Sequence, residues 1–177
     1  MNTIANAGNV QLTIKNAGLV LLNSYIPLLF ERLGLTNDRN EFTDVDARMK
    51  AVQYLQVVAA GQSITEDNML PLNKVLCGML LTQPVPNEIE IREEEIILIE
   101  GLINAAIGHW SENGSSSVPS FRGNWLLRDG LLSETEARWE LKVQGRAYDM
   151  LLNRSPFSYS IIKYPWMPKP LYVQWPS

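Results

Sequence analysis

The chain has 177 residues, of which 46% are hydrophobic and 19% charged, an ordinary globular composition with enough length for one sizeable core. Its formal net charge of −4 is spread over interspersed acidic and basic residues, so it has no basic face and is poorly suited to nucleic acid or an anionic membrane as a partner. The most apolar run, residues 17–30, is too short and too polar to span a bilayer or to act as a signal peptide, so we expect a protein made in the cytoplasm without membrane insertion.

The N-terminal part of the chain predicts a strand followed by a buried helix. Residues 10–14, VQLTI, alternate apolar and polar side chains and indicate a short strand. A turn leads into a helix over residues 19–33, whose apolar residues run almost all the way round, so we expect burial on most of its sides. Gly34 supplies the stop signal.

Two further helices are predicted before the middle of the chain. Thr43 and Asp46 have the spacing of a capping box, and apolar residues then recur at helical spacing up to Gly61. A shorter helix follows over residues 67–79, where Pro71 either starts the helix or kinks it.

The next helix is predicted over residues 88–110, and it opens with a run of glutamates. Negative charge is favourable at a helix N-terminus, and the apolar residues that follow predict a long, buried helix. Residues 111–117 form a polar loop, and residues 120–130 indicate one more short helix that ends near Gly130.

From Arg138 onward the pattern changes to that of strands. Residues 138–144, RWELKVQ, alternate apolar and charged side chains, which is typical of a half-buried strand. Residues 148–154 fit a strand or a helix. Residues 158–164 and 171–175 predict two further short strands joined by a proline turn.

These elements predict an α+β fold that is mainly α. We expect a helical body of about five helices and a small C-terminal antiparallel β region, which the strand at residues 10–14 is available to join. The chain is expected to form a single domain over residues 1–177, with a mainly helical body at 10–132 and an aromatic-rich β region at 136–177.

Residues that carry enzyme chemistry are sparse. The sequence has no Gly-rich phosphate loop, HExxH motif, nucleophile elbow or CxxC motif. His109, the only histidine, lies at a predicted helix end, where capping or packing is a simpler interpretation than catalysis or metal binding. Cys77 lies in an apolar run that favours a buried, inert thiol. We therefore predict no catalytic residue, no metal and no cofactor.

One short segment, FRGNWLLRDG, combines a tryptophan with two arginines. Arg122 and Arg128 flank Trp125 at offsets of three, which places the three side chains near one another on a helix and favours stacking of a guanidinium on the indole. A binding hot spot has this composition. So does an intramolecular clamp between the helix and the β region, and the clamp is the interpretation that we favour.

The aromatic residues are concentrated near the C-terminus, where eight of the 15 Phe, Trp and Tyr residues follow residue 135. This region must therefore cover the helices or meet a partner. We single out as anchors or interface residues Trp139, Tyr164, Trp166, Tyr172 and Trp175.

This aromatic region is open to three interpretations: a proline-rich ligand, an aromatic binding strip, or the closing strands of a packed domain. The strong β-propensity of LYVQW disfavours a polyproline ligand. Carbohydrate stacking needs exposed, coplanar rings. Closing strands of a packed domain are favoured, with the terminal strands as candidates for an exposed edge that pairs with a neighbour.

Several blocks of sequence together cover nearly the whole chain. They are IKNAGLVLLNSYIPLLFERLGL, RMKAVQYLQVVAAG, FRGNWLLRDGLL and WELKVQGRAYDMLLNRSPFSYSIIKYPWMPKPLYVQW, and their more specific elements are the NAG-x-VLL, LNK-x-LCG and PWM…V-x-W patterns. In this order the blocks resemble the tape measure proteins of contractile injection systems, which are phage-tail-like particles.

The resemblance implies a structural, non-enzymatic particle component that contacts the inner tube, the spike or hub, or the baseplate or cap, in a particle that is cytoplasmic or released by lysis. Association with further copies of the same chain, as a homo-oligomer, is a second arrangement that the sequence leaves open. A fully helical chain of 177 residues would reach only about 270 Å, so we expect either the family's globular domain without its long ruler or a short cap or adaptor. The alternative from another class is a carbohydrate-binding or hydrolase module that uses the C-terminal aromatic residues.

Overall fold

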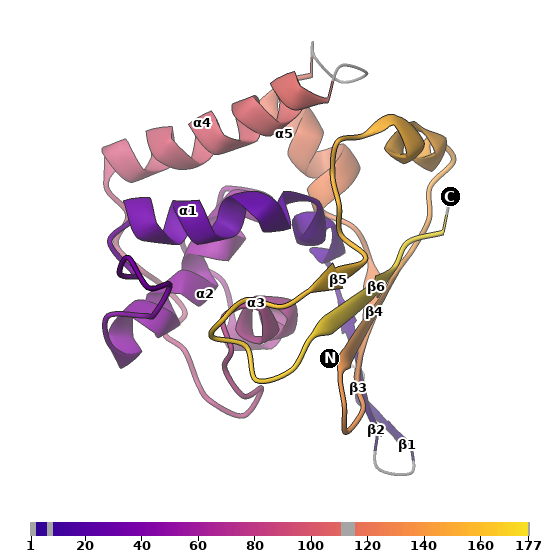
Figure 1. Cartoon of the computed structure of the whole chain (residues 1–177), viewed down its shortest axis with the longest axis horizontal. Coiled ribbons are helices and arrows are strands. Elements are labelled where there is room, and N and C mark those ends of the chain that lie inside the picture. Colours follow the sequence, from indigo (N-terminus) through magenta and orange to yellow (C-terminus); the bar gives the residue numbers. More distant parts are fainter. Residues whose placement is uncertain (1–2, 7–8, 111–115, 177) are drawn as a thin grey trace.

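The computed structural model describes residues 3–6, 9–110 and 116–176, so residues 111–115 of the predicted polar loop lie outside the described residues. Helices pack against one face of a six-stranded sheet, and the sheet forms one side of the molecule (Figure 1). The predicted fold class, α+β and mainly α, is confirmed.

Most of the described helical residues lie between the second and the third strand along the chain. The helices are η1 (Ala17–Tyr25), α1 (Ile26–Arg32), α2 (Val45–Ala60), η2 (Asp67–Met69), α3 (Pro71–Leu76), α4 (Glu93–His109), α5 (Val118–Phe121), the π-helix η4 (Arg122–Leu126) and η5 (Asp149–Arg154). The strands are β1 (Thr3–Asn6), β2 (Asn9–Ile14), β3 (Gly130–Glu134), β4 (Trp139–Val143), β5 (Ile161–Ile162) and β6 (Leu171–Gln174).

The sheet joins both ends of the chain in the order β1-β2-β3-β4-β6-β5. The strand predicted at residues 10–14 does join the C-terminal strands, because β2 pairs with β3. Neither β1 nor β3 was predicted, and β3 begins inside the segment 10–132 assigned to the helical body. Residues 148–154, which fitted either state, are helical.

The sheet is mixed, whereas the sequence predicted an antiparallel region. β4 and β6 are parallel, because the chain leaves β4 through η5, forms β5 at the edge of the sheet and then returns as β6 between them. Such a crossover gives a parallel pair that a tight hairpin cannot form. The expectation of an exposed edge is wrong for β6, because β6 is hydrogen-bonded to β4 on one side and to β5 on the other.

The start of α2 differs from the predicted capping box. Asp44 is the N-cap and accepts a hydrogen bond from the backbone N–H of Ala47 at 2.7 Å. Thr43 instead directs its hydroxyl to the carbonyl of Leu35 at 3.4 Å. Gly61 ends the helix in the left-handed region with φ of 70°, as its position predicted.

The acidic helix α4 begins at Glu93 rather than at residue 88. Residues 88 and 89 are extended, because Glu88 bridges Ile64 and the backbone N–H of Ile89 donates to the carbonyl of Ser63. The helix is also less buried than predicted. One of its faces packs on the core, while Ile97 on the other face is 63% exposed.

Among the described residues, a hydrophobic cluster runs from Ile14 to Trp175 and includes side chains of the helices and of the sheet. Leu19 and the three residues that follow it in η1 are fully buried, which agrees with the burial predicted for that segment. The sheet contributes its inward-facing residues, and β4 buries Trp139, Leu141 and Val143 in strict alternation. The C-terminal strands are thus fixed to the helical body.

Candidate protein interface

Arg128 lies in the turn between η4 and β3, and its guanidinium is fully buried among aromatic rings. Its Cζ lies 5.1 Å from the ring centroid of Trp125, 5.3 Å from that of Tyr148 and 5.2 Å from that of Trp175. The predicted stacking of an arginine on Trp125 therefore occurs, and it brings together the π-helix, η5 and the end of β6.

Asp149 is the acceptor at the centre of this cluster. Its carboxylate receives two hydrogen bonds from Arg128 at 2.6 and 2.9 Å, one from the Trp175 Nε1–H at 2.9 Å and one from the backbone N–H of Arg146 at 2.9 Å. Burial alone would raise the pKa of Asp149, but these donors and the charge of Arg128 hold it below its ordinary value. The carboxylate is therefore ionised and fully engaged.

Arg122 does not join this cluster. Its Nε and Nη2 donate to the carbonyls of Val58 and Val57 at 3.0 Å each, so it caps the C-terminal end of α2. The helical offset that predicted all three side chains together fails, because the segment is a π-helix rather than an α-helix.

A second aromatic cluster holds the proline turn before β6. The Nε1–H of Trp166 donates to the carbonyl of Leu76 at 2.7 Å. Its ring lies 5.0 to 5.7 Å, between centroids, from those of Phe30, Phe42 and Tyr164. The hydroxyl of Tyr164 donates to the carbonyl of Asn23 at 2.6 Å. Both predicted residues are therefore buried against α1, η1 and α3.

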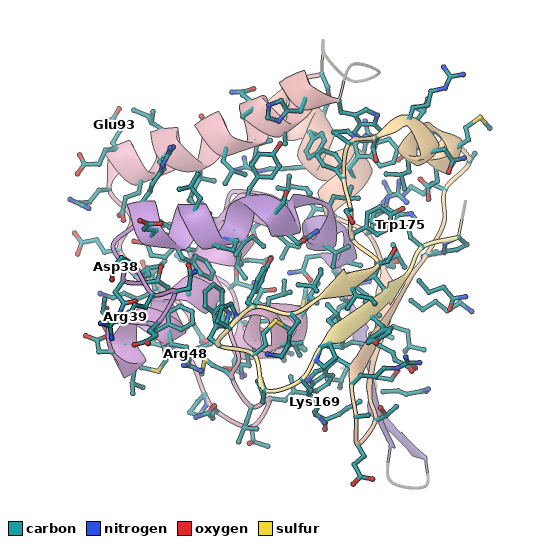
Figure 2. All side chains as sticks on the ribbon, in the orientation of Figure 1. Asp38, Arg39, Arg48, Glu93, Lys169 and Trp175 are labelled. Atoms are coloured by element: carbon teal, nitrogen blue, oxygen red, sulfur yellow. The ribbon has the colours of Figure 1, made fainter. Side chains whose placement is uncertain are left out.

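The remaining predicted residues lie on the two faces of the sheet. Trp139 points inward and is 7% exposed, with the Lys169 Nζ 5.7 Å from its ring centroid. Tyr172 is half-buried on the outer face, where the guanidinium of Arg138 lies 4.1 Å from its ring centroid. Figure 2 shows Lys169 and Trp175 at opposite ends of the C-terminal strands.

Cys77 and His109, the two residues considered as candidates for catalysis or metal binding, take part in packing and ring stacking. Cys77 is fully buried, and burial raises the pKa of its thiol well above the ordinary value. His109 Nδ1 and the hydroxyl of Tyr25 are 2.5 Å apart, and the two rings stack. Within the described ranges, no group of three His, Cys, Asp or Glu residues is placed to hold a metal ion.

In a comparison with models of known protein families, residues 3–175 match the model of the contractile injection system tape measure proteins. The chain belongs to this family. Searches of curated proteins and of solved structures give no match. As a tape-measure-type protein, the chain is a structural component of a contractile injection system and associates with other particle proteins. None of the described helices is long and apolar enough to cross a membrane.

Because the tryptophans predicted as anchors are buried, contacts of this tape measure family member with other proteins must use other surfaces. Large exposed apolar side chains lie on the helices, among them Leu28 on α1, Ile97 on α4 and Met150 on η5. Sequence patterns did not identify Asp149 or the exposed face of α4 as features of interest. The acidic residue in YDMLLNR gave no periodic signal, and α4 is apolar enough to predict burial on every side.

Proposed function

We propose that this chain acts as a compact docking unit of the particle, joining the tube, spike or baseplate through protein–protein contacts, and that it works as one domain over residues 1–177. The observation that supports this is that the described helices and the sheet pack around a shared hydrophobic core. The longest described helix, α4, has 17 residues, which corresponds to about 26 Å. A folded chain of this size supplies a contact surface rather than a measured length.

A short cap or adaptor is the second form of the same proposal. It is supported by the fastening of the C-terminal segment, in which Trp166 and Trp175 each donate a hydrogen bond into the body. A rigid body in which the segments before and after β6 are both tied to the core is suited to terminating or bridging an assembly, because little ordering entropy is lost on binding.

The alternative of a carbohydrate-binding or hydrolase module receives no support from the aromatic residues. Trp139, Trp166 and Trp175 are each less than 10% exposed, so their faces are not available for stacking on a sugar. We propose that the chain has no catalytic role, and that its predicted anchor residues act by holding the docking surface in shape.

The docking role is tested by cosedimentation. The particle is produced from its gene cluster with this chain carrying an affinity tag, and the particle fraction is separated by ultracentrifugation. We expect the chain in the particle fraction at a fixed ratio to the other components, and defective particles when the chain is deleted. Normal particles without this chain, together with a chain found only as a free monomer, would refute the proposal.

A further inference from the structure

An apolar groove runs between α1 and α4 on the surface of the molecule. The two helices lie side by side (Figure 1), and the groove has a volume of about 430 Å³. Its lining includes Leu28 from α1 and Ile97, Gly101, Leu102 and Ala105 from α4. Leu28 is 49% and Ile97 63% exposed, so two large apolar side chains border the hollow and face water.

Gly101 lies in the middle of α4 without an internal reason for being glycine. Its φ is not in the left-handed region, and a Cβ placed on it would meet nothing within 4 Å. Glycine in a helix interior is less favourable than alanine by about 1 kcal/mol. Gly101 thus leaves the backbone of α4 open to close approach from outside at this point of the groove. A helix laid in the groove would make that approach, since packed helices lie about 8–10 Å apart.

The groove ends beside an acidic pocket. Arg32 lines the end of the groove and its neighbour Leu33 lines the pocket, which has a volume of about 690 Å³. Carboxylates outnumber cations in the pocket lining. The acidic residues are Asp44, Asp46, Glu88, Glu90 and Glu95, and the basic ones are Lys50 and Arg92.

The same excess of negative charge continues onto α4. Glu93 and Glu94 occupy its exposed first turn, where Figure 2 shows Glu93 at the outer end of the helix. The helix contains four glutamates and no lysine or arginine over its length. Arg92 is engaged with Glu94 at 2.7 Å. The surface thus combines an apolar groove, in which Arg32 is the one charged lining residue, with a neighbouring pocket and helix start in which carboxylates outnumber cations.

We propose that this surface binds an amphipathic helix of another particle protein, with its apolar stripe in the α1–α4 groove and a lysine or arginine at one end directed to the acidic pocket. Helix-in-groove recognition uses apolar anchors at positions i, i+3, i+4 and i+7, and the acidic end sets the direction of the bound helix by charge complementarity. A second copy fits less well, because its own α4 has no lysine or arginine to direct to this end. The inference rests on the proposed docking role and adds the chemistry of the partner.

The test uses the full chain and a fluorescein-labelled synthetic peptide of about 18 residues, long enough to be partly helical. The peptide has leucines at the spacing of a helical stripe and two lysines at one end, and a matched peptide replaces the lysines by glutamates. Binding is measured by fluorescence anisotropy. We expect saturable binding of the lysine peptide, weakened about tenfold or more by the glutamates and reduced by salt.

Variants on the protein locate the site. Gly101→Phe fills the groove and should weaken binding about tenfold or more, whereas Gly101→Ala places one methyl where the bound helix approaches and should weaken it less, by about twofold to fivefold. Ile97→Asp should act like Gly101→Phe. The control is Met150→Asp, which alters a side chain of similar exposure, 67%, on η5. Circular dichroism confirms that each variant is folded.

Three outcomes overturn the inference: equal binding of both peptides, equal binding by Gly101→Phe and the native chain, and self-association of the chain that Ile97→Asp abolishes. The last would assign the groove to a second copy. Cosedimentation separates this inference from the docking role. If the native chain travels with particles but fails the peptide test, only the inference is wrong. If it does not travel with particles, the docking role itself is wrong.

Discussion

Arg128 and Asp149 form a bidentate ion pair inside the protein, with Nη2 to Oδ1 at 2.6 Å and Nη1 to Oδ2 at 2.9 Å. Arg128 is fully buried, and Asp149 is 2% exposed. The pair joins the turn after the π-helix to η5, and Trp175 is tied to the same carboxylate at 2.9 Å. The clamp that the segment around Trp125 predicted therefore depends on a partner 21 residues away.

Removing one member of this pair should be strongly destabilising. Arg128→Met leaves the Asp149 carboxylate buried without its main counter-charge, and breaking a buried pair typically costs about 3–5 kcal/mol. We expect a loss of this size in the free energy of unfolding, measured by urea denaturation followed by tryptophan fluorescence.

The control is an exposed ion pair between a lysine and an aspartate. Lys15 and Asp129 are 3.5 Å apart, and their side chains are 70% and 58% exposed. Lys15→Met should change the free energy of unfolding by no more than about 1 kcal/mol. Equal effects of Arg128→Met and Lys15→Met would contradict the assignment of Arg128 as a clamp.

Acid should weaken the same clamp. The pKa of Asp149 is lowered in the folded protein from its ordinary value of 3.8, so folding favours the ionised form. The stabilisation is fully present above the unfolded pKa and is lost as the pH falls through the lower folded pKa. We expect the free energy of unfolding to fall below about pH 4.

The pH dependence can be assigned to this residue by substitution. In Asp149→Asn the amide cannot ionise, so the part of the acid-induced loss that comes from this position should disappear. Urea denaturation between pH 6 and pH 2.5 measures both proteins, and Asp129→Asn controls for an exposed carboxylate. Parallel curves for the native chain and Asp149→Asn would show that another group carries the effect.

Local sequence patterns correctly predicted the elements in which buried side chains recur at a regular spacing. The alternation in β4 and the fully apolar run of η1 are examples, because each side chain's environment repeats along the element. The antiparallel region was predicted wrongly in one pairing, since the position of β6 between β4 and β5 is set by a crossover of residues 144–170 and by no local signal. Asp149 escaped prediction for the same reason. Its role depends on Arg128 and Trp175, which tertiary packing brings to it.

Gly78 marks another contact that the sequence did not reveal. It has φ of 72°, and a Cβ on it would collide with the backbone carbonyl of Trp166. Gly78→Ala should therefore cost the strain of a left-handed alanine, about 1–2 kcal/mol, and about 1–3 kcal/mol more for overpacking. Thermal denaturation followed by circular dichroism measures the loss.

The variant Gly34→Ala separates the backbone strain from the overpacking. The φ of Gly34 is 74°, and a Cβ on it would meet nothing within 4 Å. Gly34→Ala should show the backbone strain alone. The difference in stability between the two alanine variants therefore reports how closely the proline turn that contains Trp166 is held against α3. If Gly78→Ala is no less stable than Gly34→Ala, the turn is free to move away.

Trp125 allows stability and assembly to be separated. Its ring is 2% exposed and contacts Trp110, Tyr148 and Arg128. Trp125→Ala should lower the free energy of unfolding by about 3–5 kcal/mol through loss of buried aromatic packing. Incorporation into particles should fall only as the folded fraction falls, because the ring does not reach the surface.

Both quantities are measured on the same samples, stability by thermal denaturation of the isolated chain and incorporation by cosedimentation with particles. The comparison variant is Ile97→Asp, which changes an exposed side chain on α4 and should leave the melting temperature nearly unchanged. Unaltered melting of Trp125→Ala together with lost assembly would instead place Trp125 at an interface. The pair of variants therefore distinguishes a residue that holds the domain together from one that meets the particle.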